Sequence, residues 1–185
     1  MKKTFEEVKT KALKLISIKL RCKSELKDKL KDYDEDIVND VINLLEKNGY
    51  LNESLYISAF IHDKVMFTNY GEKKIVNMLY ELDLNKDLIE EEIELIDNDV
   101  WIKKIDSIIN KKIKSNKNLS KYMLFKKIKN DLLTLGYPSS LINTRLDLIE
   151  YNDLEVLEYL IRYKNIDKNK LYKKGFKYDD IKKFE

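Results

Sequence analysis

Few side chains in this sequence have the types and spacing that enzymatic chemistry requires. The 185 residues include one histidine, His62, and one cysteine, Cys22. Neither a paired-histidine metal site nor an internal disulfide is therefore expected. The sequence also lacks the glycine-rich loops, GxxxxGK[ST] or GxGxxG, that bind phosphate groups. We predict that the protein is not an enzyme and that it binds no metal and no cofactor.

The acidic run Glu90-Glu91-Glu92 is the remaining candidate for a metal site. Helical metal sites combine carboxylates with histidine or with a second, suitably spaced carboxylate motif, and neither accompanies this run. We therefore interpret the run as a solvated acidic helix face. His62 is expected to be half-exposed and structural.

Charged residues are arranged in blocks, although the net charge is only +3. Residues 1–33 contain 11 basic and 5 acidic side chains, and residues 81–99 contain 1 and 9. Residues 100–130 contain 10 and 1, and residues 161–185 contain 9 and 4. This distribution predicts separate basic and acidic zones on the surface. Because lysine far outnumbers arginine, bidentate reading of DNA bases is disfavoured.

Basic residues on three of the expected helices are the best candidates for binding a partner. If these helices stack in register, their side chains form one basic stripe; the alternative is that the lysines only cover the edge of the core. Tyr56, Tyr70 and Tyr122 are weaker candidates for a binding face, whereas Trp101 is expected in the core. The candidate partner-binding residues are Arg21, Lys23, Lys27, Tyr70, Lys73, Lys74, Lys126, Lys127 and Lys129.

Apolar residues recur at spacings of three and four along almost the whole chain, which predicts helices. The 4 glycines and 1 proline are too few for an all-β fold with many tight turns. No apolar run reaches the ~18 residues of a membrane span, so a cytoplasmic protein with no membrane partner is expected. The predicted helices cover about 4–19, 23–31, 35–47, 52–67, 72–82, 86–97, 99–114, 119–135, 138–150, 153–163 and 178–184, with a short helical turn at 168–173.

The helical pattern repeats with a period of about fifty residues. Five apolar positions, from Ile75 to Ile93, match five positions from Ile128 to Leu146 at a constant separation of 53. Chance coincidence is the alternative, but five matches without a gap favour a repeat array. We predict an all-α fold, an elongated array of three tandem three-helix repeats followed by a C-terminal helical extension. The predicted divisions are 1–48, 49–97, 98–150 and 151–185.

Three stretches of the sequence match the motif patterns of a known protein family. Arg21-Cys22-Lys23-Ser24-Glu25-Leu26 continues to Leu30 and is similar to the pattern R-S-x-x-E-L-x-x-K-L. Gly49-Tyr50-Leu51-Asn52-Glu53 continues to Phe60 and is similar to G-Y-L-[DN]-[DE]-x-x-[FY]-A-x-x-[FY]. Tyr70-Gly71-Glu72-Lys73-Lys74-Ile75 continues to Leu79 and is similar to G-x-x-[RK]-[RK]-I-x-x-x-L. In these stretches, over about residues 12–150, the chain resembles the RecX family, bacterial regulators of the recombinase RecA, and the resemblance also implies tandem three-helix repeats.

The sequence departs from the family pattern in several places: the first two repeats lack the usual Lys-Gly before the buried turn residue, most of the family's arginines are lysines here, and two single positions differ. Cys22 stands where a serine or threonine hydroxyl would cap the second helix, and a thiol is a weak acceptor. This substitution is expected to weaken the helix start by about 1 kcal/mol. Glu72 stands where the family often has proline.

The resemblance implies a regulator that binds the RecA–single-stranded DNA filament and suppresses RecA ATP hydrolysis and strand exchange, with roles in recombination and DNA repair. The expected partner is the RecA filament, with single- or double-stranded DNA as a further candidate, and the expected state is a monomer. Two alternatives remain open: a helical-repeat scaffold for a different protein, and a nonspecific nucleic-acid-binding protein.

Overall fold

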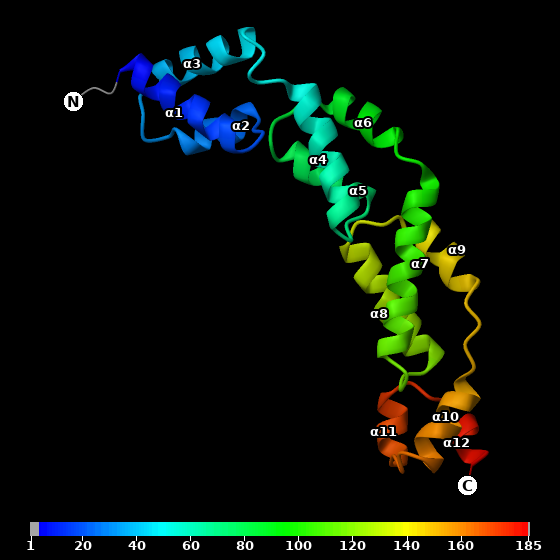
Figure 1. Cartoon of the computed structure of the whole chain (residues 1–185). Helices are drawn as coiled ribbons and strands as arrows, with labels where there is room; N and C mark the ends of the chain where they lie inside the picture. Colours follow the sequence, from blue (N-terminus) through cyan, green and yellow to red (C-terminus); the bar gives the residue numbers. More distant parts are fainter. Residues whose placement is uncertain (1–3, 185) are drawn as a thin grey trace. The chain divides into compact units, whose positions relative to one another are not determined.

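The structure, a computed structural model, describes residues 4–184 and contains helices but no strands within that range, which confirms the predicted all-α fold (Figure 1). The helices begin and end within a few residues of the predicted boundaries. They are α1 (Phe5–Ile18), α2 (Lys23–Lys29), α3 (Glu35–Lys47), α4 (Glu53–Phe67), α5 (Glu72–Tyr80), α6 (Lys86–Glu94), α7 (Asn98–Ser115), α8 (Lys121–Thr134), α9 (Ser139–Asp147), α10 (Asp153–Arg162), α11 (Lys168–Lys173) and α12 (Tyr178–Lys182).

Short polar side chains define most of the helix starts. Thr4 forms a capping box with Glu7 at α1, and the side chains of Asp34 and Asn52 accept backbone N–H groups at α3 and α4. Cys22 makes no such bond at the start of α2, as its weak acceptor sulfur predicts. The sulfur lies 3.2 Å from the Ser24 hydroxyl oxygen instead.

The described part of the chain divides into two compact units. Unit 1 comprises residues 4–68 and 75–96, and unit 2 comprises residues 69–74 and 97–184. In unit 1, α1 packs on α3 and α4 packs on α6. In unit 2, α7 packs on α8 and α9, and α11 packs on α12. The pairing of first and third helices recurs every three helices, which supports the predicted repeats, although the division at residues 48, 97 and 150 stays a prediction.

The positions that match at a separation of 53 residues are all buried, as expected for equivalent core positions. In unit 1 they are Ile75, Leu79, Leu84, Ile89 and Ile93. In unit 2 they are Ile128, Leu132, Tyr137, Ile142 and Leu146. Arg145 on α9 adds a bidentate ion pair with Asp106 on α7, with N···O distances of 2.8 and 2.7 Å.

The C-terminal extension has a hydrophobic core of its own. Leu157 and Leu160 on α10 pack against Leu171, Phe176 and Ile181 from α11, α12 and the turn between them. The extension therefore folds as a three-helix bundle, like the segments that precede it.

The turns before three of the buried apolar residues share a left-handed backbone conformation. Gly136 and Gly175 have φ of +90° and +88°, and they precede Tyr137 and Phe176. Asp83, which precedes the buried Leu84, has φ of +55°. Aspartate is one of the few residues besides glycine that adopts this region at moderate cost. The second repeat thus keeps the turn geometry without the glycine.

Each of these turns also supplies a carbonyl oxygen to the start of an earlier helix. In unit 1 the Ser24 hydroxyl donates to the Leu82 carbonyl oxygen at 2.7 Å. In unit 2 the Gly71 amide donates to the Leu135 carbonyl oxygen at 2.7 Å, and the Ser120 amide to that of Lys174 at 3.0 Å. These bonds satisfy polar groups at helix N-termini, and they fix the register between consecutive three-helix segments within each unit.

Candidate functional site

The three basic candidates of unit 1 lie together at the start of α2. They line a cleft of about 130 Å³. The basic side chains are Arg21, Lys23 and Lys27. Three carboxylates line the same cleft, those of Glu46, Glu53 and Asp83. The cleft is therefore close to neutral, and it lacks the uniform positive charge that binding of an anionic polymer favours.

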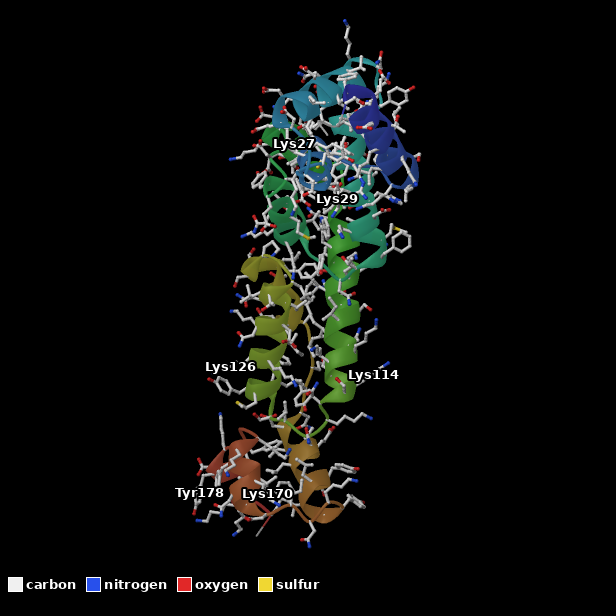
Figure 2. All side chains as sticks on the ribbon, turned by 90° about the vertical axis from the view of Figure 1, so that its left-hand side faces the viewer. Lys27, Lys29, Lys114, Lys126, Lys170 and Tyr178 are labelled. Carbon is white, nitrogen blue, oxygen red and sulfur yellow. The ribbon has the colours of Figure 1, made fainter. Side chains whose placement is uncertain are left out.

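Two of these basic side chains already have partners within unit 1. The Lys23 ammonium lies 2.6 Å from a Glu46 carboxylate oxygen, and the Arg21 Nε donates to the Leu15 carbonyl oxygen at 3.4 Å. Lys27 is exposed and is labelled in Figure 2. Because exposed ion pairs contribute little free energy, Lys23 can exchange Glu46 for another anion at small cost.

Tyr70, Lys73 and Lys74 lie at the start of α5, within unit 2. The Lys73 amide donates to the Gly136 carbonyl oxygen at 3.2 Å, so this segment contacts the turn that ends α8. The Lys74 ammonium lies 4.4 Å from the centre of the Tyr70 ring, a cation–π contact that holds it on the protein surface. Lys73 is exposed and Lys74 is half-buried. The structure thus brings the Tyr70 ring and the Lys74 charge together.

The three candidate lysines of α8 do not share one face of the helix. Lys126 and Lys129 follow Tyr122 at spacings of four and seven, so these two lysines lie on the same side of the helix as Tyr122. The Lys126 ammonium lies 6.0 Å from the Tyr122 ring centre. Lys127 points toward the end of α7, where its ammonium donates to Asn116 Oδ1 at 2.9 Å. Lys129 is half-buried, whereas Lys126 and Lys127 are exposed.

The predicted basic residues therefore form local groups on two units. One group borders the cleft at α2, another adjoins the start of α5, and the third lies along α8. Their union into one stripe remains a prediction, because the stripe would cross from unit 1 to unit 2.

Tyr56 was wrongly predicted as a candidate for a binding face. Its side chain is buried, with 3% exposed. Burial, with smaller contributions from the nearby Cys22 thiol and Glu25 carboxylate, raises the pKa of Tyr56 far above its usual range. Helical spacing does not separate a core tyrosine from a surface one when both faces of α4 carry apolar residues. The motif residues Cys22, Glu25 and Tyr56 thus form a packed junction.

Other expectations on single residues can also be compared with the structure. Trp101 is buried, as predicted, with 3% exposed. His62 is exposed instead of half-exposed, and its Nδ1 lies 3.8 Å from the neighbouring Asp63 carboxylate. Within residues 4–184 no three histidine, cysteine, aspartate or glutamate side chains are placed to hold a metal ion. In the same range no helix is long and apolar enough to cross a membrane.

Sequence reasoning missed a lysine-rich surface in the C-terminal bundle. Residues 168–177 contain five lysines and no acidic residue. Tyr172 and Tyr178, beside these lysines, stack on each other with ring centres 6.4 Å apart. The basic block at 161–185 was the available signal, but the sequence alone did not show that these lysines adjoin α8.

Known proteins resemble this chain in sequence and in fold. No family model matches the chain. The chain is 26% identical to the regulatory protein RecX of Streptococcus agalactiae serotype V over 75% of its own length and 60% of that protein. It is 26% identical to the regulatory protein RecX of Lactococcus lactis over 96% of its length and 74% of that protein. The crystal structure of RecX from Lactobacillus salivarius superposes with a TM-score of 0.70 and 26% identity, covering 78% of this chain and 97% of that one.

The chain is similar to RecX proteins in both sequence and fold. This similarity confirms the resemblance found in the three motif stretches. The chain spans about 60% of the length of the Streptococcus agalactiae RecX. Both of these relatives are named regulatory proteins.

Proposed function

We propose that this RecX-type protein is a non-enzymatic regulator that binds the RecA–single-stranded DNA filament. Binding would limit filament growth and lower the rates of ATP hydrolysis and strand exchange. The observation that carries the proposal is the joint likeness in sequence and fold to the Lactobacillus salivarius RecX, of which nearly the whole chain is covered. The proposed partner is the filament, DNA included, and the proposed state in solution is a monomer.

Several small basic groups suit a filament better than they suit a single compact ligand. A filament presents the same anionic features again at each step, so groups that are individually weak can bind it together. The exposed candidates Lys27, Lys73, Lys126 and Lys127 are available for such contacts. Surface contacts of this kind can bind a filament without a deep pocket.

Charge reversal tests the residues that we propose for filament binding. We expect Lys73→Glu/Lys74→Glu and Lys126→Glu/Lys127→Glu each to weaken co-sedimentation with RecA filaments by about tenfold at moderate salt, because an attraction becomes a repulsion. The matched control is Lys103→Glu/Lys111→Glu, which reverses two exposed lysines of α7 in the same unit. Circular dichroism checks that each variant folds.

Unchanged filament binding by both variants, with the fold intact, would exclude these lysines from the interface. A helical-repeat scaffold for a different protein predicts that no variant, and not even the wild type, binds the filament. A nonspecific nucleic-acid-binding protein predicts steep salt dependence on naked DNA and no effect on RecA.

A further inference from the structure

The C-terminal bundle and the first part of α8 each carry a lysine-rich segment. Residues 117–129 contain five lysines and no aspartate or glutamate, and residues 168–177 likewise contain five lysines and neither acidic residue. The two segments are neighbours, because the Ser120 amide donates to the Lys174 carbonyl oxygen at 3.0 Å. Gly175 packs so closely on Met123 and Ser120 that an added Cβ would lie 2.3 Å from Met123 Cγ. The segments that carry Lys126, Lys170 and Lys173 are therefore neighbours in unit 2, whereas Lys127 points to the end of α7 and Lys117 lines a separate groove.

Exposed tyrosine rings accompany these lysines. The rings of Tyr172 and Tyr178 are nearly parallel, with 9° between their planes, and their side chains remain 39% and 59% exposed. Tyr122 on α8 is 67% exposed. In Figure 2, Lys126 and Tyr178 lie along the same left-hand edge, and Lys170 is beside Tyr178. Large aromatic rings left in water next to a row of cations are typical of a binding surface.

We propose that this surface, formed by Tyr122, Lys126, Lys170, Tyr172, Lys173 and Tyr178, binds a single strand of nucleic acid. Lysines neutralise phosphates without reading sequence, and aromatic rings stack on bases of any kind. An acidic peptide would need only the cations, so the stacked tyrosines favour a ligand that carries both phosphates and flat rings. Lys126 is also a candidate for filament binding, so this inference rests on the proposed function and extends it to a site for the nucleic-acid strand itself, which can be tested without RecA.

The carboxylates near this surface make contacts of their own. Asp180 pairs with Lys183 at 2.9 Å, and the Asp153 carboxylate accepts the Lys121 amide at 2.5 Å. Asp167 caps the start of α11 by accepting the Asn169 amide at 2.9 Å. Asp153 and Asp167 keep their negative charge in these contacts, and Asp179 is exposed beside Tyr178, so a bound strand would have to avoid these three side chains.

A second location in unit 2 offers the natural comparison. A groove of about 940 Å³ is lined by Lys114, Lys117, Tyr159 and Lys164, but also by Glu155 and an apolar floor. Tyr159 and Tyr163 form another exposed ring pair, 5.7 Å apart, on α10. This groove has three lysines, as the proposed surface does, but it adds the Glu155 carboxylate and an apolar floor, so we assign the strand to the α8–α11 surface. Tyr159 then serves as the control residue.

The test is fluorescence anisotropy with the full chain and a labelled thymidine strand of about 20 nucleotides, without RecA. Tyr178→Ala is expected to weaken binding by about tenfold, and Tyr178→Phe to leave it unchanged, because phenylalanine keeps the stacking face. Tyr159→Ala, the matched control, is expected to bind like the wild type. Lys170→Gln/Lys173→Gln is expected to reduce the slope of log affinity against log salt by about 1.4, since two phosphate contacts are lost.

Three probes distinguish the ligand chemistries. A uridine strand of the same length is expected to bind as well as the thymidine strand, because the surface recognises phosphates and rings common to both. A backbone strand without bases is expected to bind about tenfold more weakly. Polyglutamate of equal charge is expected to compete poorly.

The proposal is overturned if the thymidine strand does not bind at roughly 100 µM protein in low salt. It is also overturned if Tyr159→Ala costs as much as Tyr178→Ala, or if the base-free strand or polyglutamate binds as tightly as the thymidine strand. None of these outcomes decides whether RecA filaments are bound, because RecA is not in the assay.

Discussion

Backbone conformation at single positions decides how the helices of this protein join. Gly136 and Gly49 both have positive φ, but their surroundings differ. An added Cβ at Gly136 would lie 2.5 Å from the Lys74 amide nitrogen, whereas an added Cβ at Gly49 would meet nothing within 4 Å. The first glycine is needed for close approach as well as for its φ, and the second only for its φ.

This difference makes a prediction at the residue scale. Gly49→Ala is expected to lower the free energy of unfolding by about 1 kcal/mol, the cost of a left-handed alanine. Gly136→Ala is expected to lower it by roughly 3 kcal/mol, because the turn must also move away from α5. Urea unfolding of the two variants measures both values. If both variants lost the same free energy of unfolding, Gly136 and Lys74 would not be in close contact in solution.

Tyr137 couples the stability of unit 2 to pH. Its hydroxyl donates to the Asn69 carbonyl oxygen at 3.1 Å, and burial raises the pKa of Tyr137 to about 12. Below the unfolded pKa near 10 both states keep the phenolic proton, so this tyrosine contributes no pH dependence. Between about pH 10 and 12 the unfolded state loses the proton while the folded state retains it, so stability must fall.

The Tyr137→Phe variant tests this coupling. It is expected to lose about 1 kcal/mol at neutral pH, because the Asn69 carbonyl loses a hydrogen bond. It is also expected to show a shallower fall in stability between about pH 10 and 12 than the wild type. Urea unfolding at a series of pH values provides the comparison. A variant with the same alkaline slope as the wild type would contradict the assignment to Tyr137.

At the scale of elements, most of the helices could be predicted from the sequence. Apolar spacing and caps such as Asn52 and Asn85 located both ends of nearly every helix, because these signals are local. Surface and core tyrosines could not be separated in the same way, and Tyr56 was wrong for that reason. The sequence did not show that the lysines of α11 lie near α8. Their proximity depends on a tertiary contact, the hydrogen bond from the Ser120 amide to the Lys174 carbonyl oxygen.

The docking of turns onto helix starts predicts a pattern of amide protection. The Ser120 and Gly71 amides lie at helix starts, where amides usually lack intrahelical partners, yet each donates to a turn carbonyl. Gly175→Ala places a Cβ 2.5 Å from the Ser120 hydroxyl oxygen and should displace the turn. We expect hydrogen exchange at Ser120 to accelerate by about tenfold, corresponding to the loss of one hydrogen bond, while Gly71 keeps its protection.

Hydrogen exchange followed by NMR resolves the two amides in one sample. Gly71 provides the internal control, because its acceptor turn at Leu135 is not altered by the substitution. Protection of Ser120 that survives Gly175→Ala would contradict the proposed docking of the C-terminal bundle on α8.

At the scale of the whole molecule, the repeat pattern and the family resemblance led to the same protein class by separate routes. The repeat pattern came from positions 53 residues apart, and all of these positions are buried. The resemblance came from motifs whose residues, Cys22, Glu25 and Tyr56, meet at a packed junction. Such motifs identify the family because they build the fold. The exposed lysines of the same stretches, such as Lys27 and Lys73, stay predictions for the binding surface, because exposure alone does not show what a lysine binds.

RecA ATPase activity on single-stranded DNA, titrated with this protein below the RecA concentration, tests the central claim most directly. A regulator that binds the filament lowers the steady-state rate at substoichiometric amounts, since one bound molecule affects several RecA subunits. Lys103→Glu/Lys111→Glu should inhibit like the wild type, and Lys126→Glu/Lys127→Glu should inhibit less. A rate that stays unchanged up to micromolar amounts of wild-type protein would contradict the proposed function.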